Sequence, residues 1–364
     1  MHRGNAKVII ATGGTGGHIF PGIAIAQALL KKGIEEVLFL GRENSLEERV
    51  VKRYGYSFKG ISSSGIMGKR WRHKIKGTVQ VGLGIGQCLN FLKYYRPSLA
   101  LGLGGYTSVP ALLAAKCLGI PTVVHEQNLI PGIANRILGN WAKRVCLSFK
   151  ETTLYFPREK CVITGNPVRE EIISVHRERR GKRLRVLVLG GSQGAHPINK
   201  AFLDTAKRLR GLQDRISITH QTGERDYIWV KNSYERMGIN VHVVSFIYDI
   251  AKAYAKTDLI IGRAGATSLA EITALGIPSI LIPFPWAIHQ HQFYNAKRLA
   301  SAGAAILIEQ NRLNGGVLAE NITNFLENGH LLESMSKKAL SLASPLAGEK
   351  IATLCESIIN SNRF

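Results

Sequence analysis

The sequence predicts an α/β protein built from two similar halves, each with a parallel sheet, and two internal repeats support this prediction. The tetrapeptide Leu-Gly-Ile-Pro occurs at residues 118–121 and again at 275–278, each time between a helical run and a short apolar strand. Upstream of each copy, an apolar run enters a glycine-rich turn, at residues 13–17 and 190–194. We expect two such halves to face each other across a cleft lined by these turns.

The candidate strands are unbroken apolar runs separated by helical patterns, which is typical of βαβ units. We expect strands at 7–12, 37–41, 99–102, 122–125, 185–189, 216–221, 241–245, 259–262 and 279–283, and helices that include 23–30 and 350–359. Gly and Pro near residues 165–168 break the pattern and mark the join. The predicted domains are residues 1–168 and 169–345, with a C-terminal helix in 346–364 that packs back on the first domain.

Length and charge limit the classes of function. A chain of 364 residues is long enough for two domains, each with its own core. The formal net charge of +23 implies an anionic partner, which can be a phosphate-bearing substrate, an anionic membrane surface or nucleic acid. Basic residues interleaved with aromatic stacking platforms are not evident, so we do not expect nucleic acid.

Cysteine usage and the N-terminus favour a reduced, cytoplasmic setting. The five cysteines are scattered without a Cys-x-x-Cys pair, so neither a disulfide framework nor a zinc site is indicated. No signal-peptide pattern is evident at the N-terminus. The most apolar span, residues 79–92, contains three glycines and polar side chains. It is too short to cross a bilayer, which takes about 20 apolar residues.

The first glycine-rich turn lies between a strand and a helix, where glycines let the backbone approach a ligand and the helix N-terminus offers N–H groups to an anion. Its sequence satisfies neither Gly-x-Gly-x-x-Gly nor the Walker A pattern. The alternative is a purely structural tight turn. His18, at the helix start, is the most reactive side chain nearby, and its alternative role is that of a cap or packing residue.

The second glycine-rich turn matches the Gly-x-Ser-x-Gly nucleophile elbow and suggests a rival function, an α/β-hydrolase using Ser192. Asp249 or Asp258, followed by His289 or His291, would keep the Ser…Asp…His order. The duplication argues against this rival, because the turn of the first half has no serine at the corresponding place. We therefore favour Ser192 as a phosphate contact through its hydroxyl and neighbouring N–H groups.

Glu271 has two interpretations. Ser268 and Glu271 have the Ser-x-x-Glu spacing of a capping box. Alternatively, the carboxylate faces the cleft and accepts hydrogen bonds from a vicinal diol such as a ribose, for which a group with only acceptors is suited.

Polar clusters follow corresponding strands of the two halves, at residues 125–128 and 289–295. His-x-His in the second cluster suggests a metal, but no carboxylate or cysteine lies nearby to complete a site. Polar groups at the carboxyl ends of parallel strands bind substrates more often. We therefore expect the two clusters to bind substrate and to face one another.

Taken in order, these motifs closely resemble the MurG family of bacterial N-acetylglucosaminyltransferases over essentially the whole chain. The resemblance is carried by residues 13–18 with Pro21-Gly22, 104–106, 125–128, 165–169, 190–195 and 263–271. It implies the GT-B architecture, two Rossmann-like domains with the nucleotide-sugar donor bound mainly by the second.

The resemblance also implies the reaction, a step of peptidoglycan synthesis. N-acetylglucosamine would pass from UDP-GlcNAc to the C4 hydroxyl of MurNAc in lipid I, with inversion, to give lipid II. Such a displacement needs a base on the acceptor hydroxyl and stabilisation of the leaving UDP. No cofactor is implied, and no metal is expected because the sequence has no Asp-x-Asp site for a nucleotide-bound cation.

By resemblance, Glu271 binds the ribose, Ser192 and the turn at Ala266 cradle the diphosphate, the backbone at Ile247 contacts uracil, and Gln292 contacts the sugar hydroxyls. The register of Gln292 is open, because His289-Gln290 is an alternative to His291-Gln292. The full implied donor set is Thr15, Gly16, Gly17, Asn128, Arg169, Ser192, Ile247, Ala266, Glu271 and Gln292. The acceptor set is Gly14, Thr15, His18, Tyr106, Glu126 and Asn128.

His18 is the implied catalytic base, since its unperturbed pKa lies near neutrality. Holding a phosphate is its alternative role.

A basic run precedes an apolar helix in the first half and suggests a membrane-docking surface. Lys69, Arg70, Arg72, Lys74 and Lys76 surround Trp71, and apolar residues follow. The alternative is a solvated charge run before an ordinary packed helix. The family's membrane-facing patch lies in this part of the first domain, which favours docking. The implied partners are UDP-GlcNAc, lipid I, the anionic cytoplasmic face of the inner membrane, where the protein would be peripheral, and other cell-wall synthesis proteins.

Overall fold

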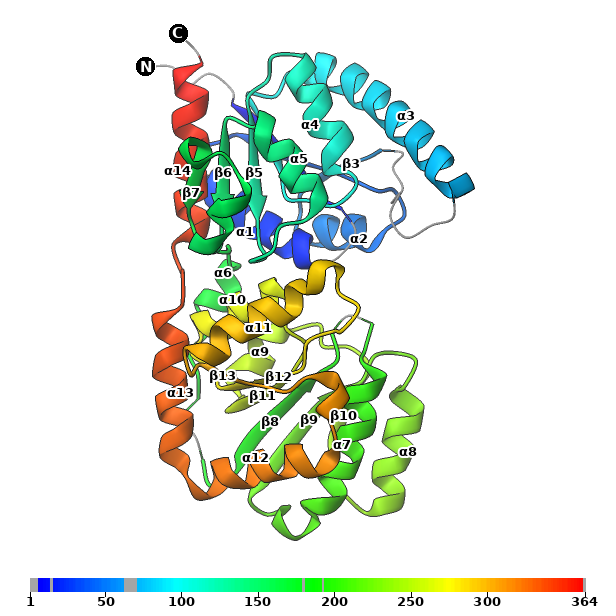
Figure 1. Cartoon of the computed structure of the whole chain (residues 1–364), viewed down its shortest axis with the longest axis vertical. Coiled ribbons are helices and arrows are strands. Elements are labelled where there is room, and N and C mark those ends of the chain that lie inside the picture. The colour runs from blue at the N-terminus through cyan, green and yellow to red at the C-terminus, as the bar shows by residue number, and fades with distance from the viewer. Residues whose placement is uncertain (1–5, 14–15, 62–70, 179–180, 192, 363–364) are drawn as a thin grey trace. The chain divides into compact units, whose positions relative to one another are not determined.

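The computed structural model describes residues 6–13, 16–61, 71–178, 181–191 and 193–362, with residues 71–81 as helix backbone. The chain forms two compact units, one of Met1–Glu170 with Ser344–Phe364 and one of Glu171–Ala343. Each unit is an α/β structure around one parallel sheet, which confirms the predicted fold class (Figure 1).

The sheet of the first unit has seven strands in the order β3-β2-β1-β4-β5-β6-β7, and every pairing between them is parallel. Strand β1 lies in the interior of the sheet between β2 and β4, and its residues after the first are fully buried. The strands are β1 (Lys7–Ala11), β2 (Glu36–Gly41), β3 (Ser57–Gly60), β4 (Leu99–Gly102), β5 (Thr122–Glu126), β6 (Arg144–Leu147) and β7 (Cys161–Ile163).

Helices cover both faces of this sheet, and the alternating side chains of β1 enter a different core on each face. Val8 and Ile10 pack with α1 and α14, whereas Ile9 and Ala11 pack with α3 and α4. The helices of the first unit are α1 (Gly16–Lys31), α2 (Leu46–Arg53), α3 (Trp71–Tyr95), α4 (Ser108–Cys117), α5 (Ile133–Trp141) and α14 (Ala347–Ser361), with 3₁₀ turns η1 (Lys150–Tyr155) and η2 (Arg158–Lys160).

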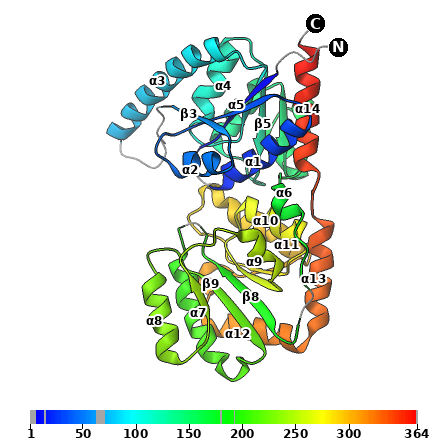
Figure 2. The same ribbon diagram turned by 180° about the vertical axis from the view of Figure 1, so that it is seen from behind.

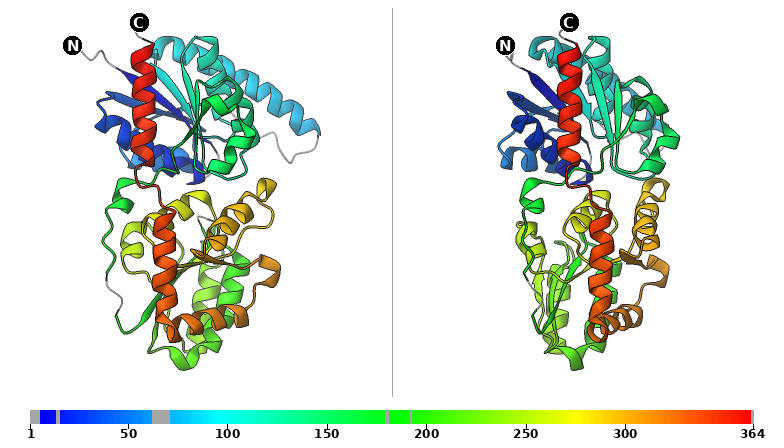
Figure 3. Two further views of the ribbon diagram at one scale, coloured as in Figure 1. Left: turned by 60° about the vertical axis from the view of Figure 1, so that its left-hand side comes forward. Right: turned by 90° about the vertical axis from the view of Figure 1, so that its left-hand side faces the viewer.

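The last helix returns to the first unit, where α14 lies beside α1 (Figure 2). Figure 3 shows this red helix against the blue N-terminal strands of the same unit. Ile351, Cys355 and Ile358 of α14 enter the core that holds Ile23 and Leu29 of α1. Short α6 (Glu170–Ile173) begins at the boundary between the units.

The second unit has a six-stranded parallel sheet in the order β10-β9-β8-β11-β12-β13. Its strands are β8 (Leu184–Leu189), β9 (Ile216–Gln221), β10 (His242–Val244), β11 (Leu259–Gly262), β12 (Ser279–Leu281) and β13 (Ala305–Leu307). Its helices are α7 (His196–Arg208), α8 (Tyr227–Met237), α9 (Ile250–Ala255), α10 (Ala266–Ala274), α11 (His291–Ser301), α12 (Gly315–Glu327) and α13 (Gly329–Ser341), with 3₁₀ turns η3 (Arg210–Leu212), η4 (Ile288–Gln290) and η5 (Gln310–Arg312).

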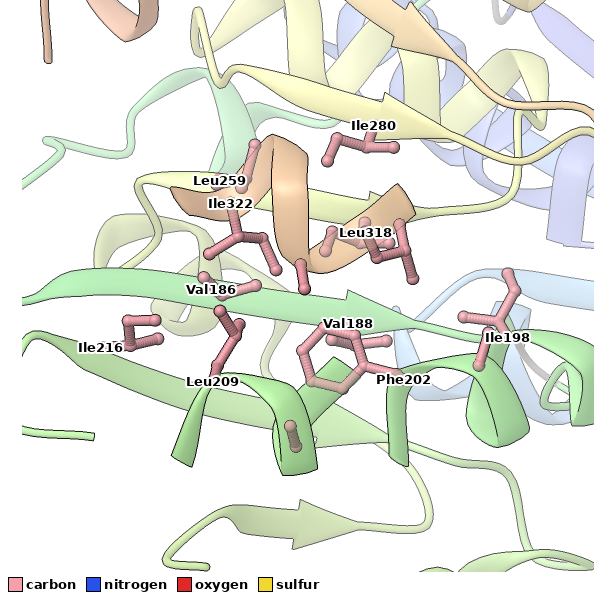
Figure 4. Close-up of a cluster of buried hydrophobic side chains, with 14 of the residues drawn as sticks. Val186, Val188, Ile198, Phe202, Leu209, Ile216, Leu259, Ile280, Leu318 and Ile322 are labelled. Atoms are coloured by element: carbon pink, nitrogen blue, oxygen red, sulfur yellow. The ribbon is translucent and has the colours of Figure 1, made fainter. Parts of the chain in front are cut away.

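The core of this unit forms between β8 and two helices. Phe202 of α7 and Leu318 and Ile322 of α12 pack with Val186 and Val188 of β8 (Figure 4). All five side chains are at most 2% exposed. The sheet that carries the second glycine-rich turn is therefore anchored by a close-packed apolar layer.

The repeated Leu-Gly-Ile-Pro is a helix stop followed by a strand start. Gly119 (φ 72°) and Gly276 (φ 60°) adopt the left-handed conformation directly after α4 and α10. The N–H of Ile120 donates to the carbonyl of Ala115, and the second copy repeats this bond between Ile277 and Ile272. This is the Schellman arrangement, which ends a helix and releases the chain into the next strand.

A buried histidine lies close to the second glycine-rich turn and is neutral in the fold. His220 on β9 contacts the Oδ1 of Asn199 through Nε2 (3.0 Å) and the hydroxyl of Tyr234 through Nδ1 (2.9 Å). The Nδ2 of Asn199 donates to the carbonyl of Thr222, so its Oδ1 must accept from Nε2–H of His220. Burial lowers the pKa of His220 to about 3.

We predict that His220 makes the stability of the second unit depend on pH. The unfolded chain takes up a proton near pH 6.5, whereas the folded ring stays neutral until about pH 3. The contribution of the neutral ring to the free energy of unfolding is therefore present above pH 6.5 and is lost as the pH falls. At pH 4.5 the loss is about 2–3 kcal/mol. Urea unfolding at pH 7 and pH 4.5 should show a smaller loss for His220→Gln than for the unchanged protein. Equal losses in the two proteins would contradict this account.

Candidate functional site

The turn after β4 is clamped onto the end of β1, where the first glycine-rich turn begins. Gly104 (φ 97°) and Gly105 (φ 79°) both adopt the left-handed conformation. The hydroxyl of Ser108 donates to the carbonyls of Ala11 (2.9 Å) and Gly104 (2.7 Å). A Cβ on Gly105 would overlap the carbonyl of Gly13, so only glycine permits this approach of two backbones.

His18 lies in the first turn of α1 and points to the end of β5. The ring is half-buried, and its Nδ1 lies 3.2 Å from the Oε1 of Gln127. A Cβ on Gly104 would come within 3.1 Å of the ring, so the neighbouring turn also limits where His18 can lie. Gly16 and Gly17 form the start of the same helix, and the predicted contacts Gly14 and Thr15 lie outside the described residues.

Glu126 at the end of β5 organises the loop that follows. One carboxylate oxygen accepts from the backbone N–H (2.9 Å) and the Nδ2 (3.2 Å) of Asn128. The other accepts from the N–H of Gly132 (3.1 Å) and from Asn135 Nδ2 (2.9 Å). Burial raises the pKa of Glu126, and these four donors counteract part of the rise. Glu126 is 1% exposed, so its carboxylate contacts the residues of the following segment and not solvent.

Two other predicted residues also lie in the first unit. Tyr106 is half-buried and follows the glycine pair of the β4 turn. Arg169 is buried, donates from Nη1 to the hydroxyl of Tyr54 (2.7 Å) and stacks its guanidinium over Phe20 of α1, 4.2 Å from the ring centroid. Arg169 therefore lies against the helix that carries His18.

The second glycine-rich turn is held by the amide of Gln221 at the end of β9. Its Oε1 accepts from the N–H of Gly190 (3.1 Å), and its Nε2 donates to the carbonyls of Gly191 (3.1 Å) and Ser245 (3.0 Å). The side chain is 3% exposed. The turn is therefore fixed without any ligand, although Ser192 itself lies outside the described residues.

Helix α10 begins beside a buried carboxylate. Its N-cap is Gly265, without a side-chain hydrogen bond, so the capping box between Ser268 and Glu271 does not form. Glu271 instead accepts from the hydroxyl of Tyr254 (3.0 Å) and is 5% exposed. Helix α10 starts at Ala266 after the N-cap Gly265, which has no side chain to cap it, and the positive end of the helix dipole lies there.

An arginine of the second unit holds the loop after β12. Arg263 donates from Nη1 to the carbonyls of Ile282 and Pro283 (3.1 Å each) and from Nη2 to the Oε1 of Gln310 (2.7 Å). Burial lowers the pKa of this guanidinium to about 10, well above neutrality. The charge is therefore retained, and it anchors the start of the loop.

The same loop ends at the predicted sugar contact. Gln292, half-buried in the first turn of α11, accepts from the N–H of Phe284 through Oε1 (3.0 Å). His289 (φ 51°) and Gln290 (φ 52°) are both exposed and adopt the left-handed conformation, which is uncommon for residues other than glycine. The backbone of this turn is strained at His289 and Gln290, which are the alternative pair for the sugar contact. The bond from Phe284 to the side chain of Gln292 closes the turn.

Ile247, the predicted uracil contact, follows β10 and lines a pocket of about 420 Å³ in the second unit. The pocket lies over β8, β9 and β10, and its lining includes Phe246, Lys252 and Lys256. The lining is of mixed character, since it also includes Asp249, Arg185 and the polar side chains of Ser217, Thr219 and His242.

The hydrolase alternative finds no support in the second unit. Asp258 pairs with Arg185 (2.9 Å), and Asp249 caps α9 by accepting from the N–H of Lys252 (3.0 Å). Among the described residues no group of three or more His, Cys, Asp or Glu side chains is arranged to hold a metal. In the same part of the chain, no helix is long and apolar enough to cross a membrane.

No individual role was predicted for four residues that hold the candidate residues in place: Gln127, which was expected only as part of the substrate-binding cluster 125–128, Arg263, which begins the motif 263–271, and Gln221 and Tyr254. Gln127 and Gln221 lie at or just beyond the carboxyl ends of strands, and this position is the one signal that could have drawn attention to them.

Comparison with known proteins gives consistent matches over both units. The model of the glycosyltransferase family 28 N-terminal domain matches residues 8–147, and that of the family 28 C-terminal domain matches residues 185–351. A protein of Thermodesulfovibrio yellowstonii is 43% identical over 98% of this chain and 100% of its own length, and one of Syntrophus aciditrophicus is 44% identical over 97% and 99%. Both are named UDP-N-acetylglucosamine–N-acetylmuramyl-(pentapeptide) pyrophosphoryl-undecaprenol N-acetylglucosamine transferase.

Solved structures show the same fold. The crystal structure of Acinetobacter baumannii MurG is 32% identical, covers 96% of this chain and 99% of its own, and superposes with a TM-score of 0.76. The UDP-GlcNAc 2-epimerase of Neisseria meningitidis, 15% identical, has a TM-score of 0.69 over 96% of this chain and 99% of its own. The second likeness shows the shared architecture alone.

Proposed function

The chain belongs to the MurG transferases of glycosyltransferase family 28, and on that premise we propose how its two units divide the reaction. It is a UDP-GlcNAc-dependent N-acetylglucosaminyltransferase that acts on lipid I and forms lipid II, in peptidoglycan synthesis. The finer steps proposed are attack by the C4 hydroxyl of MurNAc and inversion at the sugar, from an α-linked donor to a β-linked product.

The second unit is proposed to bind the donor. The observation that carries this assignment is the carboxylate of Glu271, which is buried, is fixed by Tyr254 and is not used to cap α10. A carboxylate so placed accepts from both hydroxyls of a ribose. The N–H groups at the start of α10 and of the turn with Ser192 receive the diphosphate, and their dipoles stabilise the charge that develops on the leaving UDP. The backbone at Ile247 is proposed to contact the uracil, and Gln292 is proposed to contact the hydroxyls of the sugar.

The first unit is proposed to bind the acceptor and to supply the base. His18 stands in the first turn of α1, where the positive end of the helix dipole suits the acceptor pyrophosphate, and an unperturbed imidazole has a pKa near neutrality. It removes the proton of the C4 hydroxyl as that oxygen attacks the anomeric carbon. Glu126 is proposed to act through the loop that holds Asn128, and Tyr106 to line the acceptor side. Arg169 packs on α1 and is proposed to contact the donor from the first unit.

Replacing Glu271 by Ala is expected to raise the KM for UDP-GlcNAc. Loss of a hydrogen bond to a charged group costs about 1.5–3 kcal/mol, which corresponds to roughly 10- to 100-fold. Steady-state kinetics with a lipid I analogue measure the change, with exposed Glu320→Ala of the same unit as the control. If KM stays unchanged while the melting temperature falls, Glu271 has a structural role only.

Replacing His18 by Ala is expected to lower kcat by about 10²- to 10⁴-fold, the range for loss of a general base. The KM for UDP-GlcNAc should stay nearly constant, because His18 is not in the donor set and the proposed contacts to uracil, ribose and diphosphate lie in the other unit. His330→Ala, an exposed histidine of α13, is the matched control. A raised KM for the acceptor with kcat retained would instead show that His18 holds a phosphate.

Membrane docking is proposed for the basic run at residues 69–76, whose side chains lie outside the described part. Leu83, further along α3, is exposed and continues an apolar stretch. Each basic residue near anionic lipid contributes about 1 kcal/mol. Charge reversal at Arg70, Arg72 and Lys74 should reduce sedimentation with phosphatidylglycerol vesicles, most clearly at low salt, and should spare turnover of a short-chain soluble acceptor.

The control for docking reverses three exposed lysines of the second unit, Lys200, Lys207 and Lys337. Equal vesicle binding by both triple variants and the unchanged protein would place docking elsewhere on this basic chain.

A further inference from the structure

A chain of hydrogen bonds connects His18 to two buried side chains at the end of β5. The Nε2 of Gln127 lies 2.9 Å from the carbonyl oxygen of Leu103 and 3.2 Å from the Nδ1 of His125. The Nε2 of His125 in turn lies 3.2 Å from the carbonyl oxygen of Gly165. Both side chains are at most 1% exposed, so water does not compete for these contacts.

The hydrogen bond between His125 and Gly165, the last in this series, determines which nitrogen of His125 carries the hydrogen. A carbonyl oxygen only accepts, so the Nε2 of His125 carries a hydrogen and donates it. Burial lowers the pKa of His125 to about 4, so the ring is neutral at physiological pH. Its Nδ1 therefore carries a lone pair and accepts.

The orientation of the Gln127 amide follows from its two neighbours. The carbonyl of Leu103 and the Nδ1 of His125 are both acceptors, so the group between them must be the NH₂, with one hydrogen for each. The flipped amide would put its oxygen against two acceptors and leave them unsatisfied in the interior, at a cost in stability. The Oε1 of Gln127 is therefore directed at His18.

The orientation of the Gln127 amide in turn determines which nitrogen of the neutral His18 ring carries the hydrogen. An amide oxygen only accepts, so the Nδ1 of a His18 ring that bonds to it must carry the hydrogen. In the neutral ring the lone pair is left on Nε2, at the opposite edge from Gln127. This nitrogen can take a proton from a substrate hydroxyl.

We propose that Gln127, held by Leu103 and His125, is a positioning residue that fixes His18 in the tautomer with the proton on Nδ1 and the basic lone pair on Nε2. The proposal rests on the proposed role of His18 as the general base. It gives His125 and Gln127 a function in catalysis without contact with either substrate. It also explains why a glutamine, which offers donors on one side and an acceptor on the other, occupies a buried place.

The direct test is the tautomer itself, observed by NMR on protein with ¹⁵N-labelled histidine rings. Two-bond ¹H–¹⁵N correlations distinguish the two neutral tautomers, and the signals that vanish in His18→Gln are those of His18. We expect the Nδ1–H form in the unchanged protein and in Val123→Ala, which keeps the Gln127 amide. In Gln127→Leu, which has no acceptor, the Nε2–H form should appear. An Nε2–H form in the unchanged protein, or an unaltered Nδ1–H form in Gln127→Leu, would overturn the proposal.

Kinetics provide the second test. Gln127→Leu should lower kcat by roughly 10- to 100-fold, because only part of the protein then holds the productive tautomer, while the KM for UDP-GlcNAc stays constant. Val123→Ala, a core truncation two residues before His125 on the same strand, controls for loss of stability in this unit.

The outcomes separate this proposal from the function on which it rests. Full kcat in His18→Ala would remove the base assignment and this proposal with it. An inactive His18→Ala combined with full kcat in Gln127→Leu would remove the positioning role alone. A loss of kcat in Val123→Ala equal to that in Gln127→Leu would also overturn it, because the effect would then follow stability.

Discussion

In each unit a buried glutamine amide at or just past the carboxyl end of a strand supports the turn around which the site is arranged. A glycine-rich turn leaves backbone N–H and C=O groups without partners in the sheet, and buried groups of this kind must be satisfied. Gln221 meets this need directly, with one acceptor and two donor contacts to Gly190, Gly191 and Ser245. Gln127 donates to the turn after β4 and turns its oxygen to His18. These bonds hold Gly190 and Gly191 of one turn and Leu103 at the start of the other in place.

The two units share a scaffold and differ in the chemistry placed on it. Both have a strand, a glycine-rich turn and a helix at the centre of a parallel sheet. On the first unit the helix carries His18, which can move a proton. On the second, the neighbouring helix α10 carries Glu271, and the chemistry offered is hydrogen bonding and a dipole for a nucleoside diphosphate. The proposed division of the reaction follows from this difference.

The sequence patterns predicted those elements that depend on residues close together in the chain. The Leu-Gly-Ile-Pro repeats mark two Schellman caps, and the buried strands such as β1, β8 and β11 were found because both faces of each are apolar. Strands β3, β6, β7 and β13 were missed. Strands β3, β7 and β13 are edge strands with partly exposed residues and little apolar signal, and β6 is a run of only four residues that begins with an exposed arginine. The capping box at Ser268 was a wrong local inference, because Gly265 begins the helix and Tyr254 takes the carboxylate. The contact between His18 and Gln127 joins residues 109 positions apart, so no window of sequence could show it. The partners of Glu126 lie within nine residues of it, but their hydrogen bonds depend on the fold of the loop.

The assignment of the donor to the second unit and of the acceptor to the first is tested most directly by hydrogen exchange on UDP binding, followed by mass spectrometry. If the second unit binds the donor, UDP should slow exchange in peptides that cover residues 190–195, 244–248 and 263–271. Peptides that cover residues 11–20 and 126–135 of the first unit should exchange at an unchanged rate. Protection of the His18 and Glu126 peptides without protection at Glu271 would contradict the account, because it would place the nucleotide on the unit assigned to the acceptor.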